Sequence, residues 1–279
     1  MTLNSQIARR LEEVASLLQS QGANPFRAEA YRRAAITIQR LTEPVADLFA
    51  REGLDGLRQL PGVGDHLALA IRSMILTGRL PMLEHLRGEI DPIALLQSVP
   101  GIGPTFAEKL HHDLGIDTLE ELEAAAHDGR LASLAGFGTK RIAAIVDSLA
   151  TRLGRVRGLD QSSDGQVPVQ ELLDVDREYR EAAQAGRLPK IAPRRFNPEG
   201  VAWLPILHTQ RGDRHYTALF SNTARAHQLG KTDDWVVLYY DGPMGGQQNT
   251  VITSQYGPLR GRRIVRGREA ECSEPQGSL

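Results

Sequence analysis

The spacing of hydrophobic residues changes along the chain and divides it into two differently built parts. Over residues 1–153 apolar positions recur at the three- and four-residue intervals of amphipathic helices. The first such series is Ile7, Leu11, Val14 and Leu18. Asn4 or Ser5 is expected to cap this helix, and Gly22 to end it. No segment of this part shows the alternation of a strand, so we predict an all-α amino-terminal half.

Beyond residue 200 the pattern becomes that of strands. Five segments are rich in β-branched and aromatic residues, and Gly or Asp separates them. These segments are residues 201–209, 215–220, 235–240, 250–256 and 263–265. One short helix, 223–228, is expected behind Ser221-Asn222 as its cap. We therefore predict an α+β carboxy-terminal domain of mainly antiparallel strands.

The segment between these parts differs from both in composition. Gly158 to Gln166 is polar and rich in Gly, Ser and Asp, which is typical of a linker. A helix is predicted over 169–184, and an irregular basic stretch follows from Leu188. The chain of 279 residues is then multidomain. Its expected parts are a helical region at 1–153, a linker with one helix at 154–199 and a β-rich domain at 200–279.

Composition excludes several classes of protein. Lys and Arg total 33 against 34 Asp and Glu, a formal charge of -1, so the chain is no broadly cationic, histone-like binder. A single cysteine, Cys272, excludes an internal disulfide, and no Cys/His spacing suits zinc. No apolar run approaches about 20 residues, so we expect no membrane span and a cytoplasmic protein.

A short motif occurs three times, at residues 60–68, 99–107 and 134–142. Each copy has an apolar residue, a Gly-apolar-Gly turn and then an amphipathic helix, roughly 35 to 40 residues after the previous copy. Glycine lets a backbone approach a ligand closely, and the turn presents amides at a helix start to an anion. Such a site suits nucleic-acid phosphates without reading bases. The alternative is that the turns only pack helices together.

The repeats belong to a wider resemblance. Residues 4–153 resemble the amino-terminal region of bacterial family X DNA polymerases, which holds a lyase-type 8-kDa domain and a fingers-like module built of helix-hairpin-helix motifs. The stretches that carry the resemblance are residues 22–35, 60–64, 77–80 and 99–104. No resemblance that implies a mechanism was found for the carboxy-terminal domain.

The resemblance implies DNA as the partner, bound through its backbone in gapped or nicked form. It also implies a monovalent cation, K+ or Na+, at the first two hairpins and no other required cofactor. The matching cation ligands are the carbonyls of Arg58, Leu60, Val63, Gln97, Val99 and Ile102. The expected DNA-binding residues of this half are Gly62, Gly64, Gly101, Gly103, Thr105, Gly136, Gly138, Lys140, Arg27, Tyr31 and Arg79. For Tyr31 the alternative is core packing, and for the two arginines it is an ordinary helix surface.

Departures from the family argue against its chemistry. The position of the family's Schiff-base lysine is Ala70, which has no amine. Asp65 follows the first hairpin where many members have Lys, and a carboxylate there would repel phosphate. The only trace of the polymerase palm is Asp174-Val-Asp176, which we assign to a helix surface because no Gly-Ser turn precedes it. We expect neither lyase nor polymerase activity.

The end of the chain offers a further candidate surface. Arg260, Arg262, Arg266 and Arg268 share one strand phase, interrupted by Ile264. If the strand continues through Gly267, the last three of these arginines would lie on one face and contact DNA. The alternative is a charged edge strand. His208, His215 and His227 have no metal-ligand spacing and are assigned to ordinary positions.

Three functions remain open on these observations. The first is a non-catalytic, sequence-independent DNA-binding protein, an accessory factor in DNA repair or end processing. The alternative is a nuclease or other phosphodiester hydrolase with its active site in the carboxy-terminal domain. The second alternative is a protein-interaction scaffold whose hairpins serve packing alone.

Overall fold

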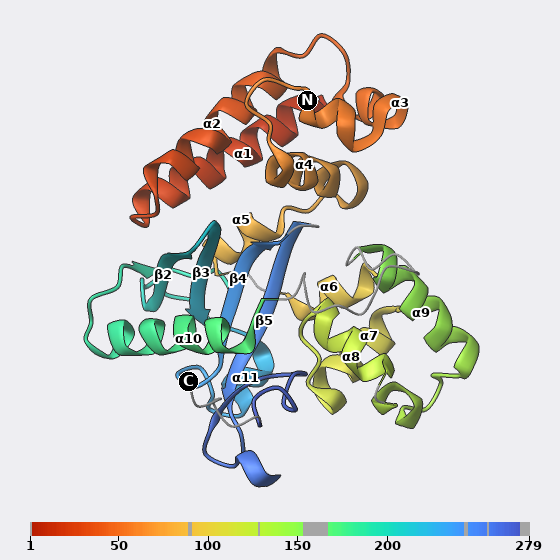
Figure 1. The fold of residues 1–279 in the computed structure, drawn as a ribbon, viewed down its shortest axis with the longest axis vertical. Coiled ribbons are helices and arrows are strands. Elements are labelled where there is room, and N and C mark those ends of the chain that lie inside the picture. The colour runs from red at the N-terminus through yellow and green to blue at the C-terminus, as the bar shows by residue number, and fades with distance from the viewer. Residues whose placement is uncertain are drawn as a thin grey trace, which may run out of the picture. The chain divides into compact units, whose positions relative to one another are not determined.

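The computed structural model describes residues 2–88, 91–127, 129–152, 167–242, 245–255 and 257–273. Helices fill the amino-terminal half, and an antiparallel six-stranded sheet in the order β1-β2-β3-β4-β5-β6 follows (Figure 1). The predicted fold class is therefore confirmed. The predicted linker, Gly158 to Gln166, lies outside the described residues. Among the described helices, none combines the length and the apolarity that a membrane crossing needs.

Five helices come first along the chain, and the first of them contains the predicted apolar series. They are α1 (Leu3–Ser20), α2 (Pro25–Arg40), α3 (Val45–Arg58), α4 (Asp65–Thr77) and α5 (Pro81–Leu86). The cap of α1 is Thr2, whose hydroxyl accepts from the Ser5 amide, and the prediction of Asn4 or Ser5 was wrong. Asn4 is buried and bonds the Glu43 carbonyl and the Val45 amide, which ties α1 to the start of α3.

A second group of helices forms its own core. It contains α6 (Pro92–Gln97), α7 (Pro104–Leu114), α8 (Leu119–His127), a 3-10 turn η1 (Arg130–Ser133) and α9 (Thr139–Arg152). Leu96, Leu110, Leu122 and Ile145 are fully buried in this core. Helix α10 (Val169–Gln184) matches the predicted range, and α11 (Ala224–Gln228) is capped by Thr223 instead of Ser221-Asn222.

A strand overlaps each of the five predicted segments. The strands are β2 (Leu204–Arg211), β3 (Arg214–Phe220), β4 (Val236–Gly242), β5 (Gly245–Thr253) and β6 (Arg263–Val265), with a 3-10 turn η3 (Gly257–Leu259) before the last. The basic stretch expected to be irregular contains a short strand, β1 (Lys190–Ile191), paired with Leu204 and Pro205. Position 246 excludes a side chain, because the Tyr239 hydroxyl lies 1.7 Å from where a Cβ would stand, and glycine fits there.

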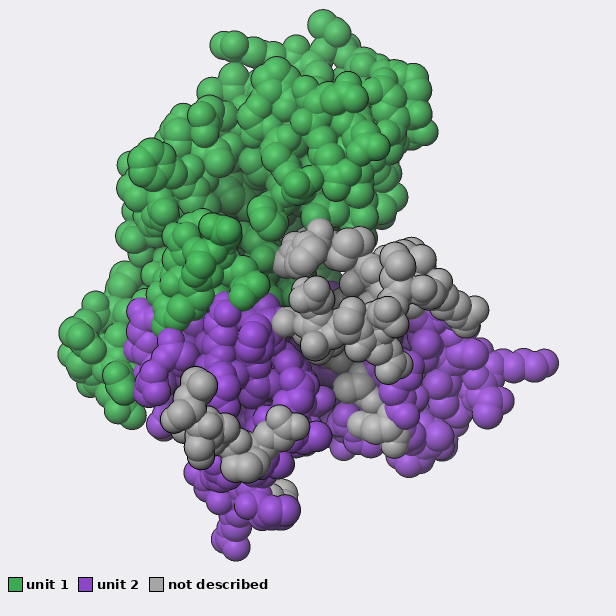
Figure 2. Space-filling view, viewed as in Figure 1, with its two compact units in different colours: residues 1–89, 181–219, 239–247 green, residues 90–180, 220–238, 248–279 purple. Residues whose placement is uncertain are grey.

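Two compact units cut across the predicted boundaries at 153 and 199. The first unit comprises residues 1–89, 181–219 and 239–247; the second comprises 90–180, 220–238 and 248–279 (Figure 2). Each unit combines helices with sheet strands. Whether 1–153 and 200–279 fold independently stays a prediction.

In the first unit, α1 and α2 are joined to the sheet by buried polar side chains. Arg27 on α2 forms an ion pair with Asp241 of β4 at 2.8 Å. His208 of β2 bonds the Gln21 side chain at the end of α1 through Nε2 and the Thr217 hydroxyl of β3 through Nδ1. Burial and the nearby charge of Arg27 lower the pKa of His208 to about 4.

The half-buried His208 predicts an acid-sensitive fold. Its pKa near 4 in the folded protein lies below the usual 6.5 of the unfolded chain, so only the unfolded state takes up the proton between these values. The His208 contribution is fully present above about pH 6.5 and is lost as the pH falls, by about 3 kcal/mol. Urea unfolding at pH 7 and pH 4.5 should show this loss in the intact chain and not in His208→Gln. The exposed His66→Gln variant is the control, and equal pH dependence in all three proteins would contradict the prediction.

Candidate nucleic-acid interface

The first hairpin turn lies between α3 and α4. Buried Val63 anchors it, and the Val63 amide donates to the Leu60 carbonyl at 3.0 Å. Gly62 has φ +78°, a conformation that favours glycine. Gly64 is the N-cap of α4 at φ -83°, and no side chain caps the helix there. The turn thus presents the start of α4 to solvent.

The second turn, between α6 and α7, repeats this geometry. Buried Ile102 takes the place of Val63, and its amide donates to the Val99 carbonyl at 3.1 Å. Gly101 has φ +88°, and Gly103 is the N-cap of α7 at φ -84°, again without a side-chain cap. Thr105 in the first turn of α7 is exposed. The predicted structural equivalence of the two turns is therefore present.

The third turn lies beside the second. The Phe106 and Phe137 rings meet edge to face at 4.9 Å, and Gly136 at φ +96° leaves room for Phe106, whose ring lies 2.9 Å from the place of a Cβ. Arg141 covers Phe106 at 4.4 Å and donates to the Gly136 carbonyl at 2.7 Å. Packing explains Gly136 by itself. Gly138 has open space around it, and Lys140 is exposed.

Charge distinguishes the first turn from the other two. Asp65 opens α4, where the second helix has Pro104 and the third has Thr139. Arg58 bonds Asp55 at 2.8 Å and Asp65 at 2.6 Å, and these two bonds raise the pKa of the guanidinium. The carboxylate of Asp65 is therefore held beside the turn and is partly neutralised there, so its repulsion of phosphate is reduced but not removed.

Three residues of the helical half that were predicted to contact DNA are buried or paired with carboxylates of the protein itself. Arg27 is buried against Asp241, and Tyr31 is buried beside it, with its pKa raised by desolvation and by Asp241. A DNA phosphate could reach neither side chain without displacing Asp241. Arg79 forms a two-pronged pair with Glu84 at 2.8 and 2.5 Å and is partly exposed. Their part in DNA binding stays a prediction.

The terminal arginines do not share one strand face. Strand β6 ends at Val265 and Gly267 has φ +81°, so the condition for a continuous basic face is not met. Arg262 is exposed, whereas Arg268 pairs with Glu271 and donates to the Val167 carbonyl. Only Arg262 of the three predicted side chains presents an open surface.

Arg266 belongs instead to a buried charge cluster in the second unit. It donates to the Gly115 carbonyl at 3.0 Å and Asp117 at 3.1 Å, lies 3.6 Å from Glu121 and stacks on Trp235 at 4.4 Å. Burial alone would lower its pKa, but Glu121 and Asp117 raise it. Asp117 also bonds His111 at 2.6 Å. The cluster locks the end of α7 to the segment after β6.

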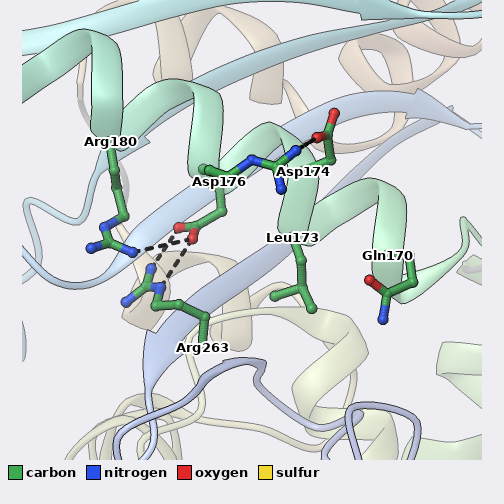
Figure 3. Close-up of a pocket in the computed structure, with 7 residues that line it drawn as sticks. Gln170, Leu173, Asp174, Asp176, Arg180 and Arg263 are labelled. Atoms are coloured by element: carbon green, nitrogen blue, oxygen red, sulfur yellow. Dashed lines mark hydrogen bonds and ion pairs between the residues drawn. The ribbon is translucent and has the colours of Figure 1, made fainter. Parts of the chain in front are cut away.

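The Asp174-Val-Asp176 pair lies on α10, so the predicted helix is confirmed, but Asp176 is buried and its predicted surface position was wrong. Arginines pair with both carboxylates. Both oxygens of buried Asp176 accept from Arg263, at 2.5 and 3.0 Å, and Arg180 approaches at 3.9 Å; Asp174 pairs with Arg177 (Figure 3). Arg263 also bonds Asp234 at 2.6 Å. Carboxylates with these partners are poor metal ligands. Within the described ranges, no three His, Cys, Asp or Glu side chains form a group that could hold a metal ion.

The repeated turns coincide with the domain types found by comparison. Residues 2–80 match the family described as helix-hairpin-helix domain, and residues 93–151 match the one described as SAM-like helix-hairpin-helix tandem. The amino-terminal half is built of helix-hairpin-helix domains. The tandem match spans the second and third turns, in agreement with their shared core.

Similarity to family X polymerases is confined to this helix-hairpin-helix half. The chain is 30% identical over 144 residues to the DNA polymerase/3′-5′ exonuclease PolX of Bacillus subtilis (strain 168), covering 51% of this chain and 24% of that protein. It is 37% identical over 84 residues to DNA polymerase lambda of Arabidopsis thaliana, covering 29% and 16%. The predicted resemblance is confirmed, and the chain spans less than a quarter of either relative's length.

Sequence reasoning missed the side chains that join the hairpins to their surroundings. Phe106 and Arg141 connect the second turn to the third, and Asp117 with Glu121 holds Arg266. A usable signal for the ring contact was Phe106 just after one turn and Phe137 inside the next, whereas Arg141 gave no such signal. The charge cluster gave no sequence signal, because Arg266 lies 149 residues from Asp117 in the sequence.

The cluster around Arg266 predicts a large stability effect. Arg266→Ala leaves two buried carboxylates without their cation, and the expected cost is about 3–5 kcal/mol of unfolding free energy. Arg262→Ala, at an exposed position, should stay within about 0.5 kcal/mol of the intact chain. Urea unfolding at neutral pH measures both, and similar losses for the two variants would contradict the cluster's structural role.

Proposed function

We propose that this chain binds DNA through backbone phosphates at its hairpin turns, without reading base sequence. The domain types and the similarity to proteins named as DNA polymerases support DNA as the partner. The even balance of charge restricts such binding to local sites, and backbone amides at helix starts are suited to that task.

One observation carries the proposal: the second glycine of each turn is not required by the fold. Gly64 and Gly103 have φ of -83° and -84°, values open to any residue, and Gly138 is not among the glycines with positive φ. At all three positions a Cβ would meet nothing within 4 Å. Neither backbone conformation nor internal packing explains glycine here. Close approach of an external group to the backbone does.

A monovalent cation at the first two turns stays part of the proposal. The carbonyls of Leu60 and Val99 each accept one turn hydrogen bond, which leaves a second lone pair for an ion. K+ or Na+ held there would supply positive charge between turn and phosphate. The chain's own contribution is the fixed direction of these carbonyls.

Repair is the setting that the family X similarity favours. We extend the proposal to gapped or nicked DNA and to an accessory role in repair or end processing, in the cytoplasm. Affinities for gapped, nicked, intact duplex and single-stranded DNA of one sequence test this extension. Equal affinity for all four would remove the structure preference and leave general DNA binding.

Gly103→Ala should weaken DNA binding without unfolding the protein. The new methyl group has space and an ordinary φ, but we expect it to hinder a phosphate from reaching the Thr105 amide at the start of α7. We expect about a tenfold loss of affinity for a gapped duplex, the size of one charged hydrogen bond. Binding by the intact chain should also weaken as salt rises, because phosphate contacts release counterions. Fluorescence anisotropy over a salt series measures both.

Two further variants control this experiment. Ser20→Ala changes an exposed residue of α1 away from the turns and should bind as the intact chain does. Gly101→Ala places a side chain at φ +88° and is expected to lower stability as well, so it shows what a folding defect looks like. Unchanged affinity in a folded Gly103→Ala protein would reduce the second turn to a packing element.

The proposed role has no lyase step. Ala70 on α4 stands where the family resemblance places the Schiff-base lysine, so no amine is available there to form an imine. Borohydride treatment with a deoxyribose-phosphate end should trap no more adduct than a denatured control. A strong adduct abolished by Lys109→Ala or Lys140→Ala would instead assign the amine to that lysine.

A further inference from the structure

The segment that leads from α10 into β2 carries positive charge that the hairpins do not use. Residues 187–203, here called the basic loop, contain four cations and one carboxylate, Glu199, for a net charge of +3. The whole chain has a formal charge of -1, so this local excess is distinctive. The four cations are Arg187, Lys190, Arg194 and Arg195. Three of them, all but Arg195, are exposed.

An exposed aromatic ring follows two of these cations. Phe196 is 46% exposed and has φ +54°, and no other non-glycine residue of the described ranges has a positive φ. This backbone conformation is unfavourable for a bulky residue, and so is the exposure of its ring to water. The Arg195 guanidinium lies 5.6 Å from the ring centroid. Strain combined with exposure of an aromatic side chain points to a function.

The basic loop is held in one conformation by its own hydrogen bonds. The Asn197 amide group donates to the Pro193 and Val201 carbonyls at 3.0 and 2.9 Å, and its oxygen accepts from the Val201 amide at 3.1 Å. Pro193 is buried against Gly88, and β1 pairs with β2. A partner would therefore meet a preorganised surface, which lowers the entropic cost of binding.

We propose that the basic loop binds single-stranded nucleic acid, with Phe196 stacked on an unpaired base and Arg187, Lys190 and Arg194 contacting phosphates. Aromatic rings and cations in one groove or loop suit single strands, because every base has a π-face and the backbone is anionic. Bases inside a duplex are already stacked and leave the ring without a partner. An acidic peptide would match the cations but leave the exposed ring unexplained. The site uses residues other than those of the hairpin turns in the proposed function.

The test uses the full chain and a fluorescent oligothymidylate at low salt. Phe196→Gly removes the ring and suits the positive φ, so the loop should keep its shape. Its affinity for oligothymidylate should fall about tenfold, as expected when one base no longer stacks on an aromatic ring. Phe196→Trp, which offers a larger ring, should bind at least as well as the intact chain. Binding of an intact duplex should be unchanged in both variants.

Charge is tested separately through the salt dependence. Replacing Arg187 and Lys190 together by Gln should reduce the slope of log affinity against log salt by about 0.7 for each phosphate that is no longer neutralised. Arg9→Gln, at an exposed arginine of α1, is the matched control and should leave the slope unchanged.

Results that overturn the inference are distinct from those that overturn the hairpin proposal. The basic-loop site would be refuted if the intact chain did not bind oligothymidylate. It would also be refuted if Phe196→Gly and the charge variant bound oligothymidylate as tightly as the intact chain does. If polyglutamate displaces oligothymidylate in a way that depends on Arg187 and Lys190 but not on Phe196, that result would assign the loop to an acidic protein partner. Gly103→Ala should weaken duplex binding only; loss of oligothymidylate binding in that variant would merge the two sites into one.

Discussion

A guanidinium that leaves water must keep its hydrogen bonds, and three buried or largely buried arginines meet this need by pairing with carboxylates from distant parts of the chain. Each pair lies within one compact unit. The pairs are Arg27–Asp241, Arg263–Asp176 and Arg266–Asp117. Because removal of either partner leaves a charge stranded in the interior, Arg27–Asp241 and Arg263–Asp176 fix β4 against α2 and β6 against α10. Arg266–Asp117 fixes the segment after β6 to the segment after α7. The sheet therefore cannot slide over its helices without breaking them.

These pairs also explain why arginines were the least predictable part of the candidate interface. Arg27 was assigned to DNA from its position in a family motif, yet its partner Asp241 lies 214 residues away in the sequence. Arg266 finds Asp117 across 149 residues. The local sequence pattern shows only that an arginine is present, and an arginine is expected at the surface unless something else is known. A carboxylate brought in by the fold from a remote segment overrules that default.

Elements governed by local rules were predicted well. Helix α10 begins and ends at the expected residues, because its apolar period is regular. The three Gly-apolar-Gly turns form as expected, since positive φ at Gly62 and Gly101 is a local requirement. Strand β1 was missed because two residues carry no period, and it exists only through pairing with β2. The basic face after β6 failed at Gly267, where one positive φ ends the strand geometry.

The helix N-termini differ in whether a side chain caps them. Side chains cap the starts of α1, α2, α6 and α11, through Thr2, Asn24, Asp91 and Thr223. The starts of α4 and α7 have Gly64 and Gly103 instead and no side-chain cap. Ser or Asp at these positions would satisfy an amide of the first turn and add a few tenths of a kcal/mol over glycine. That same side chain would occupy the space and the donors that an incoming phosphate needs. At α7 Pro104 has no N–H and the Phe106 amide bonds the Gly103 carbonyl at 3.1 Å, so the Thr105 amide is the donor that a cap would take. Under the proposed function, the absence of a cap keeps that donor available, and a stabilising cap at either turn would compete with the ligand.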